Sequence, residues 1–353
     1  MAWHHIVGQE LAKRILQQHA ALGRVTSAYL LVGPDGVGKR RLALEMAKTL
    51  NCSATERPCD ACVNCRQIDR RTHPDVHGLE PGGASRQIGI EEVRQLLSRI
   101  ALRPYSAFVQ VAIINEADRL TEEAGNSLLK ALEEPGAQTR FLLATSQLPR
   151  CLPTIISRCQ IIRCQPLAAE AVAQIVADAQ PVDADTAQAV ARRSGGSASQ
   201  ALALADRWAE HRAILDRLAD GNIAAWVEQP LPESRQEVAD LLEEMIRWLR
   251  DVAVTAVVIP AGGSAALTHP GQERVLSRRA ATVDVDRCLE TAFELMALRD
   301  SIEQFVSPRL VAALARERWL NLQAGALAQS QSRDTSIFPA GMVRGKMEAS
   351  RAV

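Results

Sequence analysis

The stretch LLVGPDGVGK, from Leu30 to Lys39, decides the fold, because an apolar run enters a glycine-rich turn that ends in a lysine. Gly33, Gly36 and Gly38 stand where a backbone must turn tightly around an anion. Lys39 opens a helix whose N-terminal amides point to the same place. The pattern predicts a phosphate-binding loop between a strand and a helix. The alternative, an ordinary glycine-rich turn, does not require a lysine at the helix start.

One position departs from the usual pattern G-x-x-x-x-G-K-[ST], since Arg40 replaces the hydroxyl residue. That hydroxyl holds Mg²⁺ against the phosphates, and a guanidinium cannot ligate a cation. A strand is expected over Phe108 to Ile114, and it ends in Asn115, where related loops carry an acid that serves the same ion. The loss of two ligands for the same ion predicts weak or absent ATP hydrolysis. Whether the loop binds a nucleotide is left open. Glu116 stands where a base for water activation is expected, and the alternative is a solvated loop carboxylate.

Four cysteines follow the helix after this loop with the spacing C-x6-C-x2-C-x2-C: Cys52, Cys59, Cys62 and Cys65. Four thiolates this close predict a tetrahedral zinc site, and a structural one, because no coordination position stays open for catalysis. A DNA-reading zinc module is an alternative. Basic residues near the cysteines favour it, but aromatic residues that could stack on bases are missing between them. The basic residues are Arg57, Arg66, Arg70 and Arg71.

The other thiols lack such spacing and are expected to be packing residues. They are Cys151, Cys159, Cys164 and Cys288. The 41 basic and 41 acidic side chains leave no net charge, so composition argues neither for nor against a nucleic-acid partner. We find no basic-then-apolar leader and no apolar run of about 18 residues, so a cytoplasmic location is expected. The 353 residues are enough for two or three domains.

Strands alternate with helices over the first 166 residues, which predicts an α/β fold with a parallel, doubly wound sheet and sites at the carboxyl ends of its strands. Further strands are expected at 28–32, 141–144 and 160–164, and helices at 6–24, 87–102 and from Thr121 to Pro135. Two helices around Pro181 are expected within 168–212. Helical spacing of apolar residues predicts a mostly helical segment over 213–328, and the tail 329–353 is expected to be disordered.

Several stretches together resemble the clamp-loader subunits of the bacterial AAA+ class. They are IVGQ at 6–9, AYLLVGPDGVGK ending at Lys39, LNC with the four cysteines, NSLLKALEEP at 126–135, FLLATSQ at 141–147 and ISRC at 156–159. The resemblance implies a nucleotide-binding domain (1–166), a helical lid (167–212) and a helical collar for oligomerisation (213–328). It also implies a hetero-pentameric ring with gamma/tau and delta subunits, which opens a sliding clamp and places it on primed DNA as part of the DNA polymerase III holoenzyme.

The resemblance further implies a role for Arg158, because the SRC stretch in clamp loaders presents an arginine to the γ-phosphate of ATP held by the neighbouring subunit. The alternative is that Arg158 pairs with a carboxylate on its own sheet edge. In active relatives a lid arginine also reaches the phosphates, and here Ser199 takes its place. This third departure favours a non-hydrolysing loader subunit. An ATP-hydrolysing motor subunit, or a related AAA+ DNA-processing ATPase, is the alternative.

Overall fold

The computed structural model describes residues 2–82, 86–261, 267–269, 271–302 and 306–334. They form two compact units that divide between Asp206 and Arg207. Within these ranges, every helix is too short or too polar to cross a membrane.

The first unit is built on five parallel strands in the order β2-β3-β4-β1-β5. Their bounds are β1 Ala28–Val32, β2 Val76–Leu79, β3 Gln110–Ile114, β4 Thr139–Thr145 and β5 Gln160–Arg163. β1 pairs with β4 and β5, and all of its residues are buried, which explains its unbroken apolar sequence. The predicted α/β fold with a parallel sheet is confirmed. The sequence does not reveal β2, a short and half-buried edge strand.

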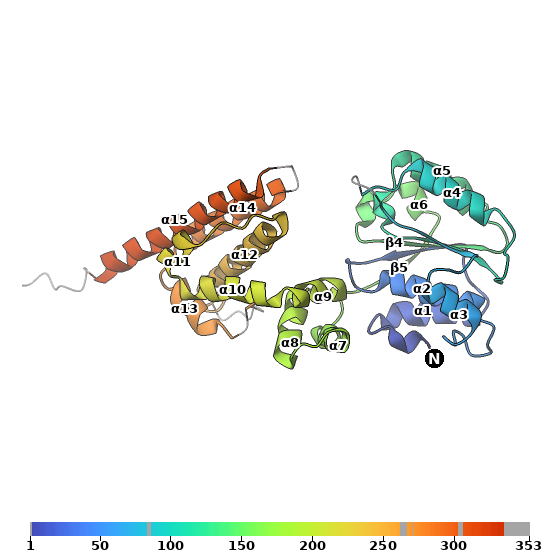
Figure 1. Ribbon diagram of the computed structural model, residues 1–353, viewed down its shortest axis with the longest axis horizontal. Helices are drawn as coiled ribbons and strands as arrows, with labels where there is room; N and C mark the ends of the chain where they lie inside the picture. The colour runs from blue at the N-terminus through green and yellow to red at the C-terminus, as the bar shows by residue number, and fades with distance from the viewer. Residues whose placement is uncertain (1, 83–85, 262–266, 270, 303–305, 335–353) are drawn as a thin grey trace, which may run out of the picture. The chain divides into compact units, whose positions relative to one another are not determined.

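Helices cover both faces of this sheet (Figure 1). One face carries α1 Glu10–Ala21, α2 Lys39–Asn51 and α3 Val63–Asp69; the other carries α4 Ile90–Ile100, α5 Glu122–Glu133 and α6 Pro153–Ile156. Side chains alternate along each strand, so Leu31 packs with Leu42 and Met46 of α2. Leu30 faces the other way and joins the cluster that contains Leu128 of α5. Short 3-10 helices are η1 Ala2–His5, η2 Ala117–Arg119 and η3 Leu148–Arg150.

Three helices complete the first unit: α7 Ala169–Ala179, α8 Ala184–Arg193 and α9 Ala198–Asp206. The sequence predicts two helices around Pro181, which correspond to α7 and α8, and the structure adds α9. Gly195 and Gly196 separate α8 from α9 with φ of +57° and +86°, a backbone region that favours glycine. The Asp183 carboxylate accepts a hydrogen bond from the Thr186 N–H at 2.7 Å and begins α8.

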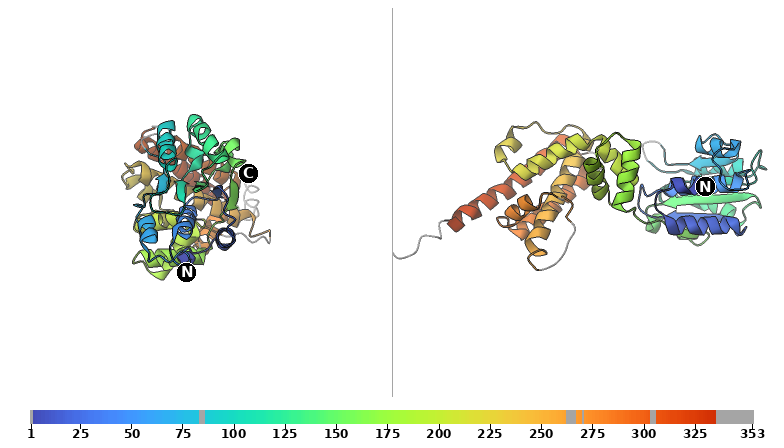
Figure 2. Two further views of the ribbon diagram at one scale, coloured as in Figure 1. Left: turned by 90° about the vertical axis from the view of Figure 1, so that its right-hand side faces the viewer. Right: turned by 90° about the horizontal axis from the view of Figure 1, so that it is seen from below.

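The second unit is all helical, and Figure 2 shows its helices from two further sides. They are α10 Trp208–Asp220, α11 Ile223–Glu228, α12 Arg235–Val257, α13 Glu273–Ala280, α14 Val285–Ile302 and α15 Pro308–Asp334. Ser234 and Glu237 form a capping box that begins α12. The core surrounds Trp248 and Trp319, which are both fully buried.

Two predicted boundaries differ from this arrangement. The end of the lid at residue 212 falls inside α10, because one continuous helix runs through that position and its His211 is buried in the second unit. The predicted disordered tail begins at 329, but α15 continues to Asp334. Residues 335–353 of that tail lie outside the described residues.

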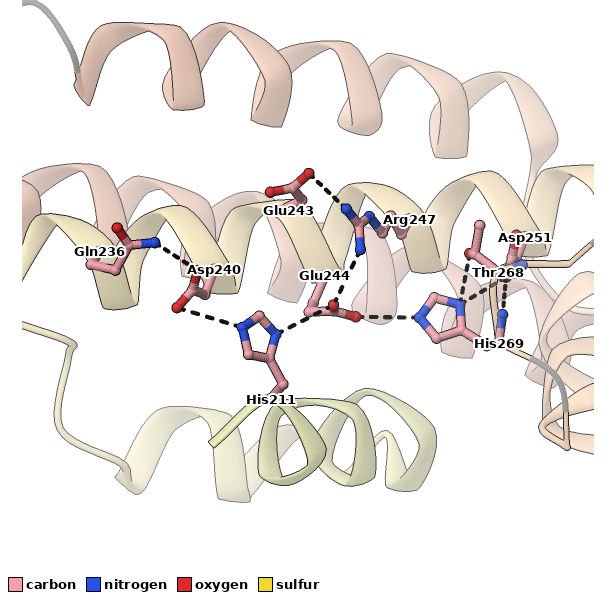
Figure 3. A network of polar contacts seen from close by, with 9 residues as sticks. All are labelled: His211, Gln236, Asp240, Glu243, Glu244, Arg247, Asp251, Thr268 and His269. Carbon is pink, nitrogen blue, oxygen red and sulfur yellow. Dashed lines mark hydrogen bonds and ion pairs between the residues drawn. The ribbon is translucent and has the colours of Figure 1, made fainter. Parts of the chain in front are cut away.

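A chain of buried polar side chains runs along α12 (Figure 3). His211 of α10 lies 3.6 Å from Asp240 and 3.5 Å from Glu244. His269, in the loop before α13, lies 3.3 Å from Glu244 and 2.7 Å from Asp251. Each buried carboxylate therefore has a partner, as the cost of burying a charge requires.

Candidate nucleotide site and metal centre

The predicted phosphate-binding loop lies at the carboxyl end of β1, where open α/β sheets place their sites. Gly36 and Gly38 have φ of +74° and +101°, which explains why glycine occupies both positions. Glycine occupies position 33 for another reason, because a Cβ there would lie 2.2 Å from the carbonyl oxygen of Cys164. The loop therefore has the compact shape that the sequence predicts.

Lys39 is turned onto its own loop. Its ammonium group donates to the carbonyl oxygens of Gly33 at 2.7 Å and Pro34 at 2.6 Å, and it lies 3.7 Å from the Asp35 carboxylate. The side chain is nearly buried, and this burial lowers the pKa of Lys39 although Asp35 opposes the shift. A phosphate would have to replace these carbonyl contacts before Lys39 could bind it.

Arg40 pairs with Glu80, which directly follows β2. Arg71 lies 3.8 Å from the same carboxylate. The position that usually supplies a hydroxyl ligand to Mg²⁺ therefore supplies a guanidinium that is already paired.

The end of β3 carries Asn115, whose backbone N–H donates to the Leu79 carbonyl at 2.9 Å. Its neighbour Glu116 has φ of +52°, and its carboxylate lies 3.9 Å from both Arg86 and Arg119. Neither observation tests Glu116 as a base, so that role stays a prediction.

Asp118 is a site residue that the sequence analysis misses. Its carboxylate accepts a hydrogen bond from the Thr145 hydroxyl at 2.5 Å, which joins the ends of β3 and β4. It is also one of the charges that raise the pKa of Lys39 against the effect of burial. Its position four residues after the end of the apolar strand β3 is the signal that could have revealed it.

The first turn of α9 packs against the loop. The Ala198 N–H donates to the Gly36 carbonyl at 3.0 Å. A Cβ on Gly36 would lie 2.1 Å from the hydroxyl oxygens of Ser197 and Ser199. Ser199, at the position where the resemblance implies a lid arginine in active relatives, therefore brings a small neutral side chain to the loop.

The four predicted metal ligands come together. The Sγ atoms of Cys52, Cys59, Cys62 and Cys65 all lie within 4.8 Å of one another. A tetrahedral zinc site with Zn–S bonds of about 2.3 Å places its sulfurs about 3.8 Å apart, so the cluster fits such an ion. The prediction that these four residues lie close enough together to hold one metal ion is therefore confirmed, and the zinc itself stays a prediction.

Backbone N–H groups prepare two of these thiols for metal binding. Burial alone would raise the pKa of Cys62, but N–H donors of Cys65 and Ser53 lower it to about 6. The N–H groups of Ala61 and Cys62 lower the pKa of Cys59 in the same way. Burial raises the pKa of the other two thiols, Cys52 and Cys65. Because the thiolate is the ligand, a bound cation would favour all four in that form.

Lys48 anchors the cysteine cluster to the unit. Its buried ammonium lies 2.5 Å from Glu45, 2.7 Å from Asp60 and 3.0 Å from Asp69. Burial opposes the charge, but the three carboxylates outweigh burial and raise the pKa of Lys48. Asp60 belongs to the cysteine loop and Asp69 to α3, so a single cation joins both to α2.

Arg158 follows α6 at the surface. Its guanidinium donates from Nε to the Glu133 carboxylate at 2.8 Å, pairs with it through Nη2, and donates from Nη1 to the Thr154 carbonyl at 3.0 Å. The side chain keeps 32% of its area exposed. Arg158 is thus paired with a carboxylate of its own chain, which lies on α5 and not on the sheet edge that the alternative explanation names.

Comparison with known proteins finds similar proteins over part of the chain. Residues 8–168 match the family described as DNA polymerase III, delta subunit. DNA polymerase III subunit delta' of Bacillus subtilis is 35% identical over 213 residues, which cover 60% of this chain and 64% of the relative. A gamma subunit of Buchnera aphidicola is 34% identical over 206 residues, 56% of each chain. A tau subunit of Salmonella typhimurium is 33% identical over 257 residues, 68% of this chain and 39% of the relative.

The parallel sheet, the phosphate-binding loop and the helices on both faces of the sheet form the α/β P-loop domain that the sequence predicts. The chain is therefore similar to the delta, delta', gamma and tau subunits of DNA polymerase III over part of its length. The chain spans 64% or less of the length of these three relatives.

Proposed function

We propose that this chain is the delta-prime subunit of a bacterial clamp loader. In this role it joins gamma/tau and delta in a hetero-pentameric ring in the cytoplasm and helps to open the sliding clamp and load it on primed DNA. The observation that carries the proposal is the pairing of Arg40 with Glu80 at the position where a motor subunit holds Mg²⁺. Without that ligand and with Asn115 in place of an acid, the ion that neutralises the phosphates lacks protein support. We therefore expect the isolated chain to show no ATP turnover above background.

A second candidate is the ATP-hydrolysing gamma/tau subunit. It is favoured by the gamma and tau relatives, which match this chain with nearly the same identity as delta'. ATP turnover by the isolated chain that disappears in Lys39→Ala would support this candidate over the delta-prime assignment.

We assign to Arg158 a role in the active site of the neighbouring subunit, as an arginine finger. A guanidinium stays charged and meets two phosphate oxygens at once, and such a contact is worth roughly 10³ to 10⁵ in rate. The pairing with Glu133 does not oppose this role. Both side chains are partly exposed, and an exposed ion pair contributes only about 0.2–1 kcal/mol. Exchange of Glu133 for a phosphate therefore costs little.

Two variants in a reconstituted loader separate the explanations of Arg158. Arg158→Ala removes the guanidinium, whereas Glu133→Gln removes only its partner on the same chain. On our proposal, Arg158→Ala lowers DNA-stimulated ATPase at one site and impairs clamp loading, and Glu133→Gln leaves both intact. Unchanged ATPase and loading with Arg158→Ala, together with an equal loss of stability in both variants, would show that Arg158 serves only its own fold.

We further propose that the four-cysteine cluster holds one structural zinc ion per chain, and metal analysis tests this directly. Cys65→Ser should lose the ion, because the fourth ligand of a closed tetrahedral site is missing. Cys159→Ser, outside the cluster, should keep one equivalent. In both variants the sheet should stay folded by circular dichroism, since Cys65 lies outside the two apolar clusters on the sheet and Cys159 lies only at the margin of one of them. Well under one equivalent in the unaltered protein, purified without chelator, would contradict the proposal.

A further inference from the structure

A hollow of about 600 Å³ lies against the edge strand β2. It is lined by the chain around the start of β2, the end of α4 and the start of β3. Because the strands are parallel, it lies at the opposite end of the sheet from the phosphate-binding loop. The proposed clamp-loader function assigns nothing to it.

The hollow is strongly basic. Arg71, Arg99 and Arg103 line it, and the single carboxylate among its lining residues is Asp75. Asp75 is buried and accepts hydrogen bonds from the backbone N–H groups of residues 105–107 at 2.7, 2.7 and 2.8 Å. In the described part of the chain, Arg71 lies 3.8 Å from Glu80, which also pairs with Arg40. Arg99 and Arg103 form no ion pair there. The hollow therefore attracts anions.

Two neutral imidazoles lie beside these arginines. His73 accepts a hydrogen bond from the Asp75 N–H on Nδ1 at 3.1 Å, so its own hydrogen is on Nε2. That Nε2 is buried and has no partner among the described residues. Burial lowers the pKa of His73, and burial together with the Arg99 charge lowers the pKa of His77. A bound anion would oppose these effects, so anion binding should be coupled to proton uptake.

An aromatic side chain completes the hollow. Tyr105 keeps 88% of its area exposed, although its backbone is held by Asp75. Near it in sequence, Phe108 is 54% exposed and carries the guanidinium of Arg57 5.7 Å from its ring centre. The hollow itself therefore combines three arginines with one exposed aromatic side chain, Tyr105. That combination is typical of proteins that bind single-stranded nucleic acids, where arginines contact phosphates and bases stack on rings.

We propose that this hollow binds a single-stranded nucleic acid, with a phosphate held by Arg99 and Arg103 and a base stacked on Tyr105. The site requires neither ATP nor a neighbouring subunit. It is therefore a property of the single chain and does not rest on the role of Arg158.

The test measures binding of a fluorescent oligothymidylate of about ten nucleotides to the full chain by anisotropy, since single-strand sites of this kind cover about 4–16 nucleotides. The variant Arg99→Ala/Arg103→Ala should weaken binding about tenfold and reduce the salt slope of log K by about 0.7, because one phosphate is no longer neutralised. The control Arg14→Ala/Arg94→Ala removes the same charge from exposed positions on α1 and α4 outside the hollow and should change little. Tyr105→Ala should weaken binding about fivefold or more.

Binding of inorganic phosphate, measured as a comparison, distinguishes a site for a nucleic-acid strand from a site for any small anion. Both ligands should shift the ring resonances of His73 and His77, but only the affinity for the oligonucleotide should depend on Tyr105. Three results would overturn the proposal: no binding by the unaltered chain, equal weakening by the control pair, or indifference of oligonucleotide binding to Tyr105→Ala. None of them alters the expected effect of Arg158→Ala on the loader ATPase, so the two proposals fail separately.

Discussion

Asp251 shows how single residues hold the second unit together. Its fully buried carboxylate accepts hydrogen bonds from the Thr268 N–H at 2.9 Å, the Thr268 hydroxyl at 2.7 Å and the His269 N–H at 2.9 Å (Figure 3). Arg250 pairs with its other oxygen at 2.7 Å. Burial would raise the pKa of Asp251, but the donors of His269 and Thr268 lower it below the ordinary 3.8. The charged form is therefore the one that ties residues 268–269 to α12.

We expect Asp251→Asn to lower the free energy of unfolding of the second unit by about 3–5 kcal/mol at pH 7, because its partners lose a buried charge. Since the folded-state pKa is lowered, the contribution of Asp251 is complete above pH 3.8 and is lost as the pH falls through the folded value. The difference between the two proteins should narrow below pH 3.8. Urea unfolding followed by tryptophan fluorescence measures it.

The exposed Asp300→Asn is the control for this prediction and should change stability by less than about 0.5 kcal/mol. A difference between Asp251→Asn and the unaltered protein that stays constant from neutral to acid pH would contradict the role assigned to the charge.

At the scale of elements, the contact between α9 and the phosphate-binding loop depends on a missing side chain. Gly36 has a positive φ and lies against the hydroxyls of Ser197 and Ser199. Gly23, after α1, has a similar φ of +65° but nothing within 4 Å of an added Cβ. Both glycines thus need a positive φ, and they differ only in whether neighbouring atoms leave room for a Cβ.

Gly36→Ala should therefore destabilise the first unit more than Gly23→Ala does. Each change strains the backbone by about 1–2 kcal/mol, and overpacking against α9 adds about 1–3 kcal/mol at Gly36 alone. The Ala198 amide, which donates to the Gly36 carbonyl, should also exchange its hydrogen faster in Gly36→Ala. Equal stability losses and unchanged exchange at Ala198 would mean that α9 does not pack on the loop in solution.

At the scale of the whole molecule, each unit has its own core. Two apolar clusters lie on the faces of the sheet in the first unit, and a third lies entirely within the helices of the second unit. Trp319 of α15 is fully buried in that third cluster, where its ring lies 5.7 Å from Trp226. Damage to this core should therefore stay within the second unit.

Trp319→Ala should cost the second unit about 3–5 kcal/mol, the usual result of removing a large buried ring. The remaining tryptophans of that unit report its unfolding in urea. Hydrogen exchange in β1 and β4 should stay unchanged, because those strands belong to the other unit. The control Leu310→Ala, at a 53% exposed position of the same helix, should change stability by less than about 0.5 kcal/mol. Faster exchange in β1 and β4 of Trp319→Ala would show that the units unfold as one.

The sequence by itself determined the features that depend on neighbouring residues. The strand at 28–32 follows from its apolar run, and the loop after it from the glycines that its backbone angles require. The start of α5 follows from Thr121, whose hydroxyl accepts the Ala124 N–H at 3.3 Å. The four cysteines belong here too, because close spacing keeps their sulfurs within reach of one ion.

Only the tertiary structure decided which residues far apart in the sequence are in contact. It turned Arg40 toward Glu80, packed Ser199 on Gly36 and brought Arg57 onto Phe108. It also made an edge strand of Val76–Leu79, a segment too short and too weakly apolar to show a strand pattern. The physical reason is that such contacts depend on the path of the whole chain between the partners, whereas caps, glycine turns and short ligand spacings are set within a few residues.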